Sequence, residues 1–531
     1  MAYTDGSIGL AVAQRIVEMF SFSRASWPQR LWRASSIDSL RHCIDLIDGG
    51  ARDGAKGYAI KEARRSIEVD LFIPGRDRGG ILKALAVAPE RMRAGSTVDA
   101  KLRSLTAELE RQYPSWVQAH VAEVDDTVTV ANSHVDGNKL SWQLAAFFRS
   151  AGMSDSWIRN FHNYHLHHNP DVISLAESTR LACNSIASPS GWTFFIPLVG
   201  RRSFNVSAAP LLGRREFEER FQIDLPEVPV PNNRGGLVIS VDVTDKHAAI
   251  EHVELEIQRV LERYRASGTK RRMVLDTFAW VTPGSWKTAI SAEAEPRIVV
   301  RSLDAFGGRD MFGRASDELE AALDLLTAAD RTSHRAATIA AWAVLETLFA
   351  DESDFGELAA IADKAADILT CLYVQSTFGD LALGHARAGT DTLSVELREA
   401  DSAAAALLTE AELPSHPLSV NATVGELARQ RAAKMSVGEV RSVRSQIAAV
   451  LRRLYDIRNQ IVHAGRMAPF GLDRTYEEST VLLSALMDEL IKQHRSTNRS
   501  AREVAGRASW LLERVESDRA TPASLAAISS A

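Results

Sequence analysis

The residues with the clearest chemical potential lie between 454 and 466, in the run LYDIRNQIVHAGR. Arg458, Asn459 and His463 combine a guanidinium that can hold a phosphate with an imidazole that can move a proton. These groups suit cleavage of RNA without a metal ion, because RNA carries its own nucleophile in the 2′-hydroxyl. The structural alternatives are an arginine that forms an ion pair or extends to solvent, and a histidine that only caps a helix.

The element that must position these residues is an amphipathic helix. Its apolar positions recur in steps of three and four, at Ile447, Val450, Leu451, Leu454, Ile457 and Ile461. Arg458 falls near the middle of this apolar face, so its charge needs a polar partner. Gly465 is the expected terminator, and a histidine near the carboxyl end of a helix suits a general acid.

The spacing of Arg458 and His463 raises a geometric question. At about 100° per residue, five positions of a straight helix separate the two side chains by ~140°. They can converge if the helix unwinds near Val462, or if a second copy of the motif faces the first across a dimer. The sequence leaves both arrangements open.

A concentration of positive charge precedes the motif. Residues 429 to 466 hold nine basic and two acidic side chains, a net charge of +7, whereas the whole chain carries -6. This strip predicts a bound phosphate-bearing ligand, with Arg452, Arg453 and Arg466 as candidate RNA-binding residues. The alternative is a solvated helix face that pairs with acids elsewhere in the chain.

The motif resembles the signature of HEPN domains, especially the ApeA-like branch, in which an arginine, a polar residue and a histidine are spaced as Arg458, Asn459 and His463 are. Tyr455 and the trailing Gly465 strengthen the likeness. An upstream segment, residues 341 to 349 (AWAVLETLF), is similar to the helix that carries a Leu-Glu pair in this branch. Ala350 stands where some relatives have a basic residue.

Glu346 lies beside the apolar stripe of that upstream helix. A carboxylate bordering one core face and an arginine on another make a natural buried pair. We therefore predict that Glu346 contacts Arg458.

The resemblance implies a metal-independent endoribonuclease that leaves 2′,3′-cyclic phosphate and 5′-hydroxyl ends. It implies Arg458, Asn459 and His463 as catalytic residues, Glu346 and Tyr455 as supporting residues, no metal or other cofactor, and a homodimer. RNA would be the substrate, with tRNA as one candidate, and the setting would be antiviral defence or a toxin. The rival hypotheses are a non-catalytic HEPN protein that binds RNA or a nucleotide, and a dimeric DNA-binding regulator.

Composition gives the frame for these hypotheses. The 531 residues predict about three domains, and 45% hydrophobic with 24% charged residues is ordinary for a soluble globular protein. The three cysteines are too far apart for a zinc pattern or a disulfide framework. No apolar run approaches the ~18 residues of a membrane span, so a cytoplasmic protein without membrane contact is expected.

The chain divides into four blocks, which predict a mixed, mainly α fold. Residues 1–190 are expected to be mainly helical, residues 191–310 a small α/β domain, residues 311–495 the HEPN-type helical bundle, and residues 496–531 a helix and a disordered tail. The first two blocks would sense a phage-derived or nucleic-acid trigger.

Several elements are predicted within these blocks. The expected helices cover residues 98–113, 140–161, 246–265, 315–329, 335–350, 355–373, 393–408, 440–463, 476–494 and 500–515, and the expected strands cover residues 193–198, 236–243, 274–281 and 297–303.

Two weaker motifs lie in the first block. Residues 151–158 suit the turn of a helix-turn-helix, with Ser154 as N-cap. Four histidines, His162, His165, His167 and His168, lie close together, and a polar surface or a nucleic-acid contact is favoured over a metal site for them.

Overall fold

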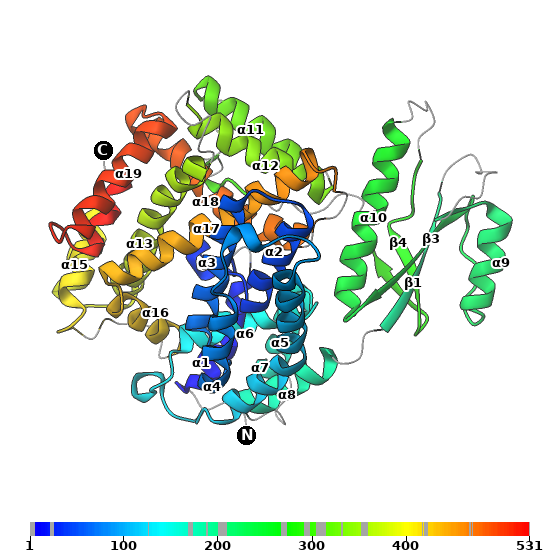
Figure 1. Cartoon of the computed structure of the whole chain (residues 1–531), viewed down its shortest axis with the longest axis horizontal. Coiled ribbons are helices and arrows are strands. Elements are labelled where there is room, and N and C mark those ends of the chain that lie inside the picture. Colours follow the sequence, from blue (N-terminus) through cyan, green and yellow to red (C-terminus); the bar gives the residue numbers. More distant parts are fainter. Residues whose placement is uncertain are drawn as a thin grey trace.

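The computed structural model describes residues 6–21, 26–125, 127–167, 174–186, 190–199, 210–266, 273–290, 298–303, 315–330, 333–351, 359–416, 418, 423–466, 469 and 471–529. The protein is mainly helical, with one five-stranded antiparallel sheet in the middle of the chain. The predicted fold class, mixed and mainly α, is confirmed (Figure 1).

The N-terminal region is a helical body with its own core. Tyr113 and Phe147 pack inside it with their ring centroids 5.4 Å apart. The helices are α1 (Ile8–Met19), α2 (Ser36–Asp48), α3 (Asp53–Val69), α4 (Gly75–Ala84), α5 (Thr97–Ala122), α6 (Gly137–Ser150), α7 (Asp155–His167) and α8 (Leu175–Ile186), with the 3-10 turns η1 (Trp27–Gln29), η2 (Pro89–Arg91) and η3 (Val130–Asn132).

The middle region is a sheet in the order β2-β3-β1-β4-β5 with a helix on each face. Alternation along β1 separates the faces: Phe194 joins the core under α10, whereas Phe195 joins the core under α9. In the register of β1 with β3, Phe194 lies opposite Ile239. The elements are β1 (Ser190–Pro197), β2 (Leu211–Leu212), α9 (Arg214–Asp224), β3 (Gly236–Val243), α10 (Lys246–Ala266), β4 (Phe278–Thr282) and β5 (Trp286–Ala289).

The C-terminal region is a larger helical body in which α13 and α17 pack together. Its elements are η4 (Arg301–Leu303), α11 (Asp317–Asp330), α12 (His334–Phe349), α13 (Ala359–Ala388), α14 (Thr392–Glu399), α15 (Ser402–Glu412), α16 (Val424–Ala433), α17 (Val437–Val462), α18 (Leu472–Thr497), α19 (Ala501–Glu516) and η7 (Pro522–Ser529).

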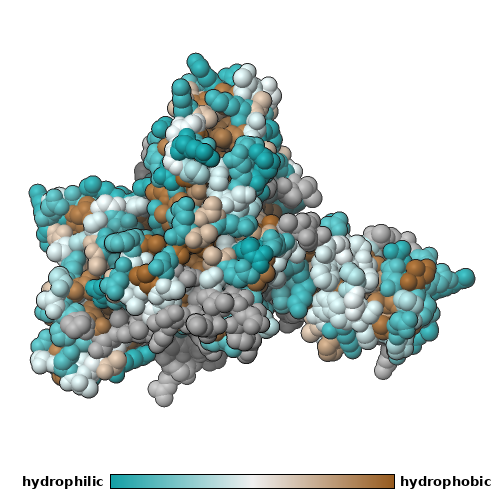
Figure 2. Space-filling view, turned by 90° about the horizontal axis from the view of Figure 1, so that it is seen from below, coloured by the Kyte–Doolittle hydropathy of each residue, from teal (hydrophilic) through white to brown (hydrophobic). Residues whose placement is uncertain are grey.

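The two helical bodies interlock through exchanged side chains. Trp32, from the N-terminal region, belongs to the C-terminal core and lies 6.4 Å from the Tyr373 ring. Leu427 of α16 belongs in turn to the N-terminal core. The sheet region projects as a separate lobe, and the face seen in Figure 2 is mostly hydrophilic, with small groups of hydrophobic side chains.

Two predictions in the C-terminal half of the chain are wrong. Within residues 297–303 the described part is coil and the 3-10 turn η4; the N–H groups of Val299 and Ser302 donate to Ser484 and Asp488 of α18, so they do not pair with a strand. The tail after Glu516 is ordered in η7, where Leu525 and Ile528 are fully buried. Its small apolar residues bury against the bundle, which composition alone did not reveal.

Other element boundaries shifted for local reasons. The predicted helix 140–161 is two helices, α6 and α7, because Ser154 caps the second one. The predicted helix 393–408 is also divided, by Asp401, which caps α15. The strand predicted at 274–281 is found as β4, at residues 278–282. Residues 355–358 of the helix expected at 355–373 lie outside the described residues.

Two residues of the predicted histidine cluster belong to the N-terminal core. His162 and His165 are buried, and the His162 ring packs 5.9 Å from the Phe148 ring. Burial lowers the pKa of His162 to about 3, so its imidazole is neutral at ordinary pH. The expected polar surface or nucleic-acid contact is wrong for these two residues; His167 is exposed, and His168 lies outside the described residues.

Arg453 lies in a buried ion-pair cluster between the two helical bodies. Its guanidinium contacts Glu62 of α3 at 2.7 Å and Glu478 of α18 at 3.1 Å. Arg453 and Glu478 are nearly inaccessible to solvent, so each charge depends on the other for compensation.

None of the helices in the described part of the chain combines the length and the apolar character that crossing a membrane requires.

The buried cluster predicts a large effect of Arg453→Met on stability. Removal of the cation leaves Glu478 buried without its main partner, which should cost about 3–5 kcal/mol of unfolding free energy. Arg441→Met on the same helix is the control, because Arg441 is half-exposed and its loss should cost no more than about 0.5 kcal/mol. Equal losses of the two variants in urea denaturation would contradict the buried cluster.

His162 predicts an acid-sensitive term in the stability. Its folded-state pKa is about 3, and an unfolded histidine has a pKa near ~6.5. The unfolded chain therefore gains a proton that the folded chain excludes, and stability falls as the pH drops below ~6.5, by about 1.4 kcal/mol per unit. His162→Phe should flatten the loss of stability between about pH 6.5 and about pH 4.5, whereas His134→Phe, at an exposed position, should leave the slope unchanged. Parallel slopes for wild type and His162→Phe would rule out this origin.

Candidate functional site

The Arg458 and His463 side chains meet within one chain. The helix α17 ends at Val462, and His463 is its C-cap, with its N–H on the carbonyl of Asn459 at 2.8 Å. Gly465 adopts a φ of 63°, as expected for a terminator, and lets Arg466 N–H reach the Gln460 carbonyl. The Nη1 atom of Arg458 then lies 3.2 Å from Nε2 of His463. The helix end closes the angular gap, so this contact needs no second chain.

Polar neighbours surround the Arg458 guanidinium. Nη1 donates to the side-chain oxygen of Asn459 at 3.0 Å, and Nη2 lies 3.9 Å from Oε1 of Glu346. The predicted contact between Glu346 and Arg458 is therefore confirmed, as a long ion pair. The Trp342 indole donates to the same Glu346 oxygen at 2.7 Å, and Tyr455 packs on the Trp342 ring with centroids 4.8 Å apart. Trp342 thus orients the carboxylate.

The contact between Arg458 and His463 has a chemical consequence. A guanidinium only donates hydrogen bonds, so it can pair with Nε2 only through the lone pair of that nitrogen. His463 is exposed and the Arg458 side chain is 22% exposed, so a phosphate can reach both groups. A phosphate that binds Arg458 would compete for the guanidinium and free Nε2 for proton transfer.

The basic strip before the motif is largely neutralised by acids from other elements. Arg444 pairs with Asp367 at 2.6 Å, Lys434 with Asp136 at 2.8 Å, and Arg441 with Glu516 at 3.6 Å. Among the ion pairs that the strip forms within the described residues, the one between Arg458 and Glu346 is the longest, at 3.9 Å. The strip is thus mainly a set of structural ion pairs, the alternative that the sequence left open.

The three candidate RNA-binding arginines are all engaged inside the protein. Arg453 is buried in its ion-pair cluster, so its predicted contact with RNA is wrong. Arg452 pairs with Asp363 at 2.5 Å and lies 4.3 Å from the centre of the Tyr58 ring. Arg466 pairs with Asp45 at 2.7 Å. Arg452 and Arg466 are part-exposed and keep their structural partners.

The N-terminal region holds the end of α17 through Asp45 of α2. Its two carboxylate oxygens accept from Gln460 and Arg466, each at 2.7 Å, on the two sides of His463 in the sequence. His42, one turn earlier on α2, lies 3.4 Å from Asp456. Sequence reasoning missed Asp45 because its partners lie more than 400 positions later and no local pattern links them.

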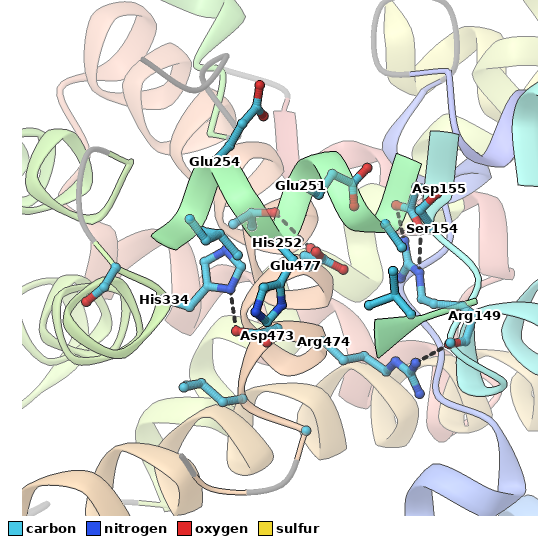
Figure 3. Close-up of a pocket in the computed structure, with 18 of the residues that line it drawn as sticks. Arg149, Ser154, Asp155, Glu251, His252, Glu254, His334, Asp473, Arg474 and Glu477 are labelled. Atoms are coloured by element: carbon cyan, nitrogen blue, oxygen red, sulfur yellow. Dashed lines mark hydrogen bonds and ion pairs between the residues drawn. The ribbon is translucent and has the colours of Figure 1, made fainter. Parts of the chain in front are cut away.

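A cavity of about 1550 Å³ lies beside the same region, between α10 of the middle domain and the helices α12 and α18 (Figure 3). Glu251 of α10 and Asp473 and Glu477 of α18 are among its lining residues. Ile339 and Leu472 line the cavity and also pack with Ile457 and Ile461 of α17. Ile339 and Leu472 thus lie between the cavity and the motif helix.

The turn proposed for a helix-turn-helix is closed off at this junction. Ser154 caps α7 as predicted, with the Trp157 N–H on its hydroxyl at 3.0 Å. Its hydroxyl and N–H also donate to Asp245 of the middle domain, at 3.0 and 2.9 Å, and both residues are buried. This packing weighs against a turn that docks on DNA.

Comparison with known proteins adds no relative: no protein family, no curated protein and no solved structure matches this chain.

Proposed function

We propose that this protein is a metal-independent endoribonuclease whose active site is built on Arg458, Asn459 and His463. The observation that carries the proposal is the convergence of Arg458 and His463 at an accessible helix end, with Nη1 and Nε2 3.2 Å apart. One group suits a phosphate and the other suits proton transfer, and they are close enough to act on the same phosphodiester.

The proposed reaction uses the 2′-hydroxyl of RNA as the nucleophile. Arg458 binds the scissile phosphate and stabilises the charge that develops on it. His463 transfers protons, Asn459 orients the phosphate or the histidine, and Glu346 holds the guanidinium with help from Trp342. The products are a 2′,3′-cyclic phosphate and a 5′-hydroxyl.

A homodimer is part of the proposal. Transfer of two protons, from the nucleophile and to the leaving oxygen, is served best by two groups, and among the described residues one chain brings a single histidine, His463, within hydrogen-bond distance of Arg458. Two motifs facing each other would supply two histidines to one cleft.

We also propose that the N-terminal and middle regions control the nuclease activity. Asp45 holds the residues on both sides of His463, and Ile339 and Leu472 lie between the cavity under α10 and the apolar face of α17. A phage-derived or nucleic-acid trigger on either region would thus act on the geometry of the motif. We propose a cytoplasmic role in antiviral defence or as a toxin, with RNA as substrate and tRNA as the first RNA to test.

His463→Ala should abolish cleavage of RNA and of tRNA in the presence of a chelator, with a loss of at least about 100-fold in rate, the lower end of general acid–base contributions. His134→Ala, at an exposed position outside the motif, should cut as the wild type does. Cyclic phosphate ends on the products are identified by their resistance to a phosphatase that acts only on phosphate monoesters. RNA binding without cleavage by every variant, wild type included, would favour the non-catalytic binder.

Asp45→Asn should lower the turnover rate by about tenfold with little change in KM, because it removes the charge that holds Arg466 beside the motif. The matched control is Asp48→Asn on the same helix, whose partner Arg103 belongs to α5 and is 43% exposed. The turnover number of each variant is measured on one defined RNA substrate, and the two numbers are compared. The same turnover for both variants would exclude Asp45 as a positioning residue.

A further inference from the structure

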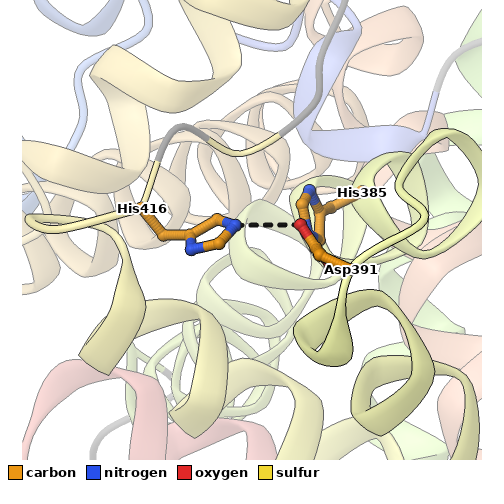
Figure 4. Close-up of side chains that lie close together, drawn as sticks. All are labelled: His385, Asp391 and His416. Carbon is orange, nitrogen blue, oxygen red and sulfur yellow. Dashed lines mark hydrogen bonds and ion pairs between the residues drawn. The ribbon is translucent and has the colours of Figure 1, made fainter.

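Three side chains of the C-terminal region converge outside the motif: His385, Asp391 and His416 (Figure 4). Nε2 of His385 lies 3.1 Å from Oδ1 of Asp391, and Nε2 of His416 lies 3.0 Å from Oδ2. Their ligand atoms all lie within 4.8 Å of one another, and no other group of three histidine, cysteine or acidic side chains within the described ranges meets this condition.

The chain holds two of these side chains firmly. His385 lies in the last turn of α13 and is fully buried, and Asp391 is the N-cap of α14, where it accepts the Ser394 N–H at 2.8 Å. Gly389 permits the tight corner between them, because a Cβ there would meet the His385 imidazole at 3.2 Å and its carbonyl at 2.8 Å. Arg398 fastens the corner by donating to the Ala386 and Gly389 carbonyls.

The third side chain comes from a different place in the fold. His416 follows α15, 25 residues after Asp391. The Asp391 and His416 side chains are 39% and 31% exposed, so an ion and a water molecule can approach from the solvent side. One deep ligand and two part-exposed ligands leave an open position.

The charges and distances suit a cation. The Asp391 carboxylate lies between the two imidazoles, with one oxygen beside each Nε2 atom, so one oxygen ligand and two nitrogen ligands converge on one place. In a tetrahedral zinc site, bonds of about 2.0–2.2 Å place neighbouring ligand atoms about 3.3–3.6 Å apart. The two histidine–carboxylate separations, 3.1 and 3.0 Å, are a little shorter than this range. The metal-free alternative is a carboxylate that accepts one hydrogen bond from each imidazole.

We propose that His385, Asp391 and His416 bind a divalent transition-metal ion, with Zn²⁺ as the ion that two imidazoles and one carboxylate fit best. This revises the expectation of a protein without metal. The ion would fasten the segment after α15 to the corner between α13 and α14, and it shares no residue with the site at Arg458. The proposed RNA cleavage therefore stays free of metal chemistry.

The test is Zn²⁺ titration by calorimetry of untagged, chelator-treated full-length protein, with Mg²⁺ as the comparison ion. Wild type should bind one Zn²⁺ per chain and no Mg²⁺, because imidazole ligands disfavour hard cations. Asp391→Asn and His416→Gln should each weaken Zn²⁺ binding by about 100-fold or more, which is at least the loss caused by removing an outer-shell partner. His134→Gln is the control and should bind as the wild type does.

Two further measurements keep the proposal open to refutation. Zn²⁺ should raise the melting temperature of the wild type and of His134→Gln but not of the two ligand variants. The Asp391→Asn variant still folds α14, because asparagine is as good an N-cap as aspartate. Co²⁺ should give the intense visible absorption of a four-coordinate site in the wild type and in His134→Gln but in neither ligand variant. Equal Zn²⁺ affinity in wild type and ligand variants, or binding of Zn²⁺ by neither, would overturn the proposal and leave the RNA cleavage untouched.

Discussion

The fold depends on how the cations of α17 are neutralised by acids that come from elsewhere in the chain. A helix with so many arginines cannot lie between two helical bodies unless carboxylates meet its charges. Glu62 of the N-terminal region and Glu478 of α18 meet Arg453 at 2.7 and 3.1 Å, and Asp45 meets Arg466, just after the end of the helix, at 2.7 Å. The same contacts that join the two bodies therefore fix the helix that carries the candidate site.

This neutralisation changes the meaning of the basic strip. Charge counted along a sequence treats every arginine as available, whereas the structure assigns most of them to partners. Arg458 differs by degree: its contact with Glu346 is long, at 3.9 Å, and its other neighbours, Asn459 and His463, offer neutral acceptors. A phosphate can bind such a guanidinium with the smallest free-energy cost, because the internal contacts that it replaces are weak.

The sequence predicted the parts of the fold that have strong local periodicity. The strand Gly236–Val243, the helix from Lys246 and the contact between Glu346 and Arg458 follow from patterns within short windows or from one resemblance. The misplaced features depend on distant partners: residues 298–303 lie against α18, and the tail after Glu516 buries Leu525 in the bundle. The group of His385, Asp391 and His416 escaped notice for the same reason, since its spacing matches no short motif.

The geometry of the helix end also changes which groups a second chain would have to supply to the candidate site. A straight helix would have left Arg458 and His463 on different faces, and a partner chain would then have been needed to bring a guanidinium and an imidazole together. The C-cap at His463 and the turn at Gly465 achieve this within one chain. In the proposed reaction a dimer then serves a narrower purpose, which is to supply a second proton-transfer group. Asp45 accepts hydrogen bonds from Gln460 and Arg466, three positions before and three positions after His463. A movement of α2 against α17 would therefore displace the His463 imidazole. Asp45 is thus a direct contact between the N-terminal region and the helix end that carries the candidate site, in addition to the contact of His42 with Asp456.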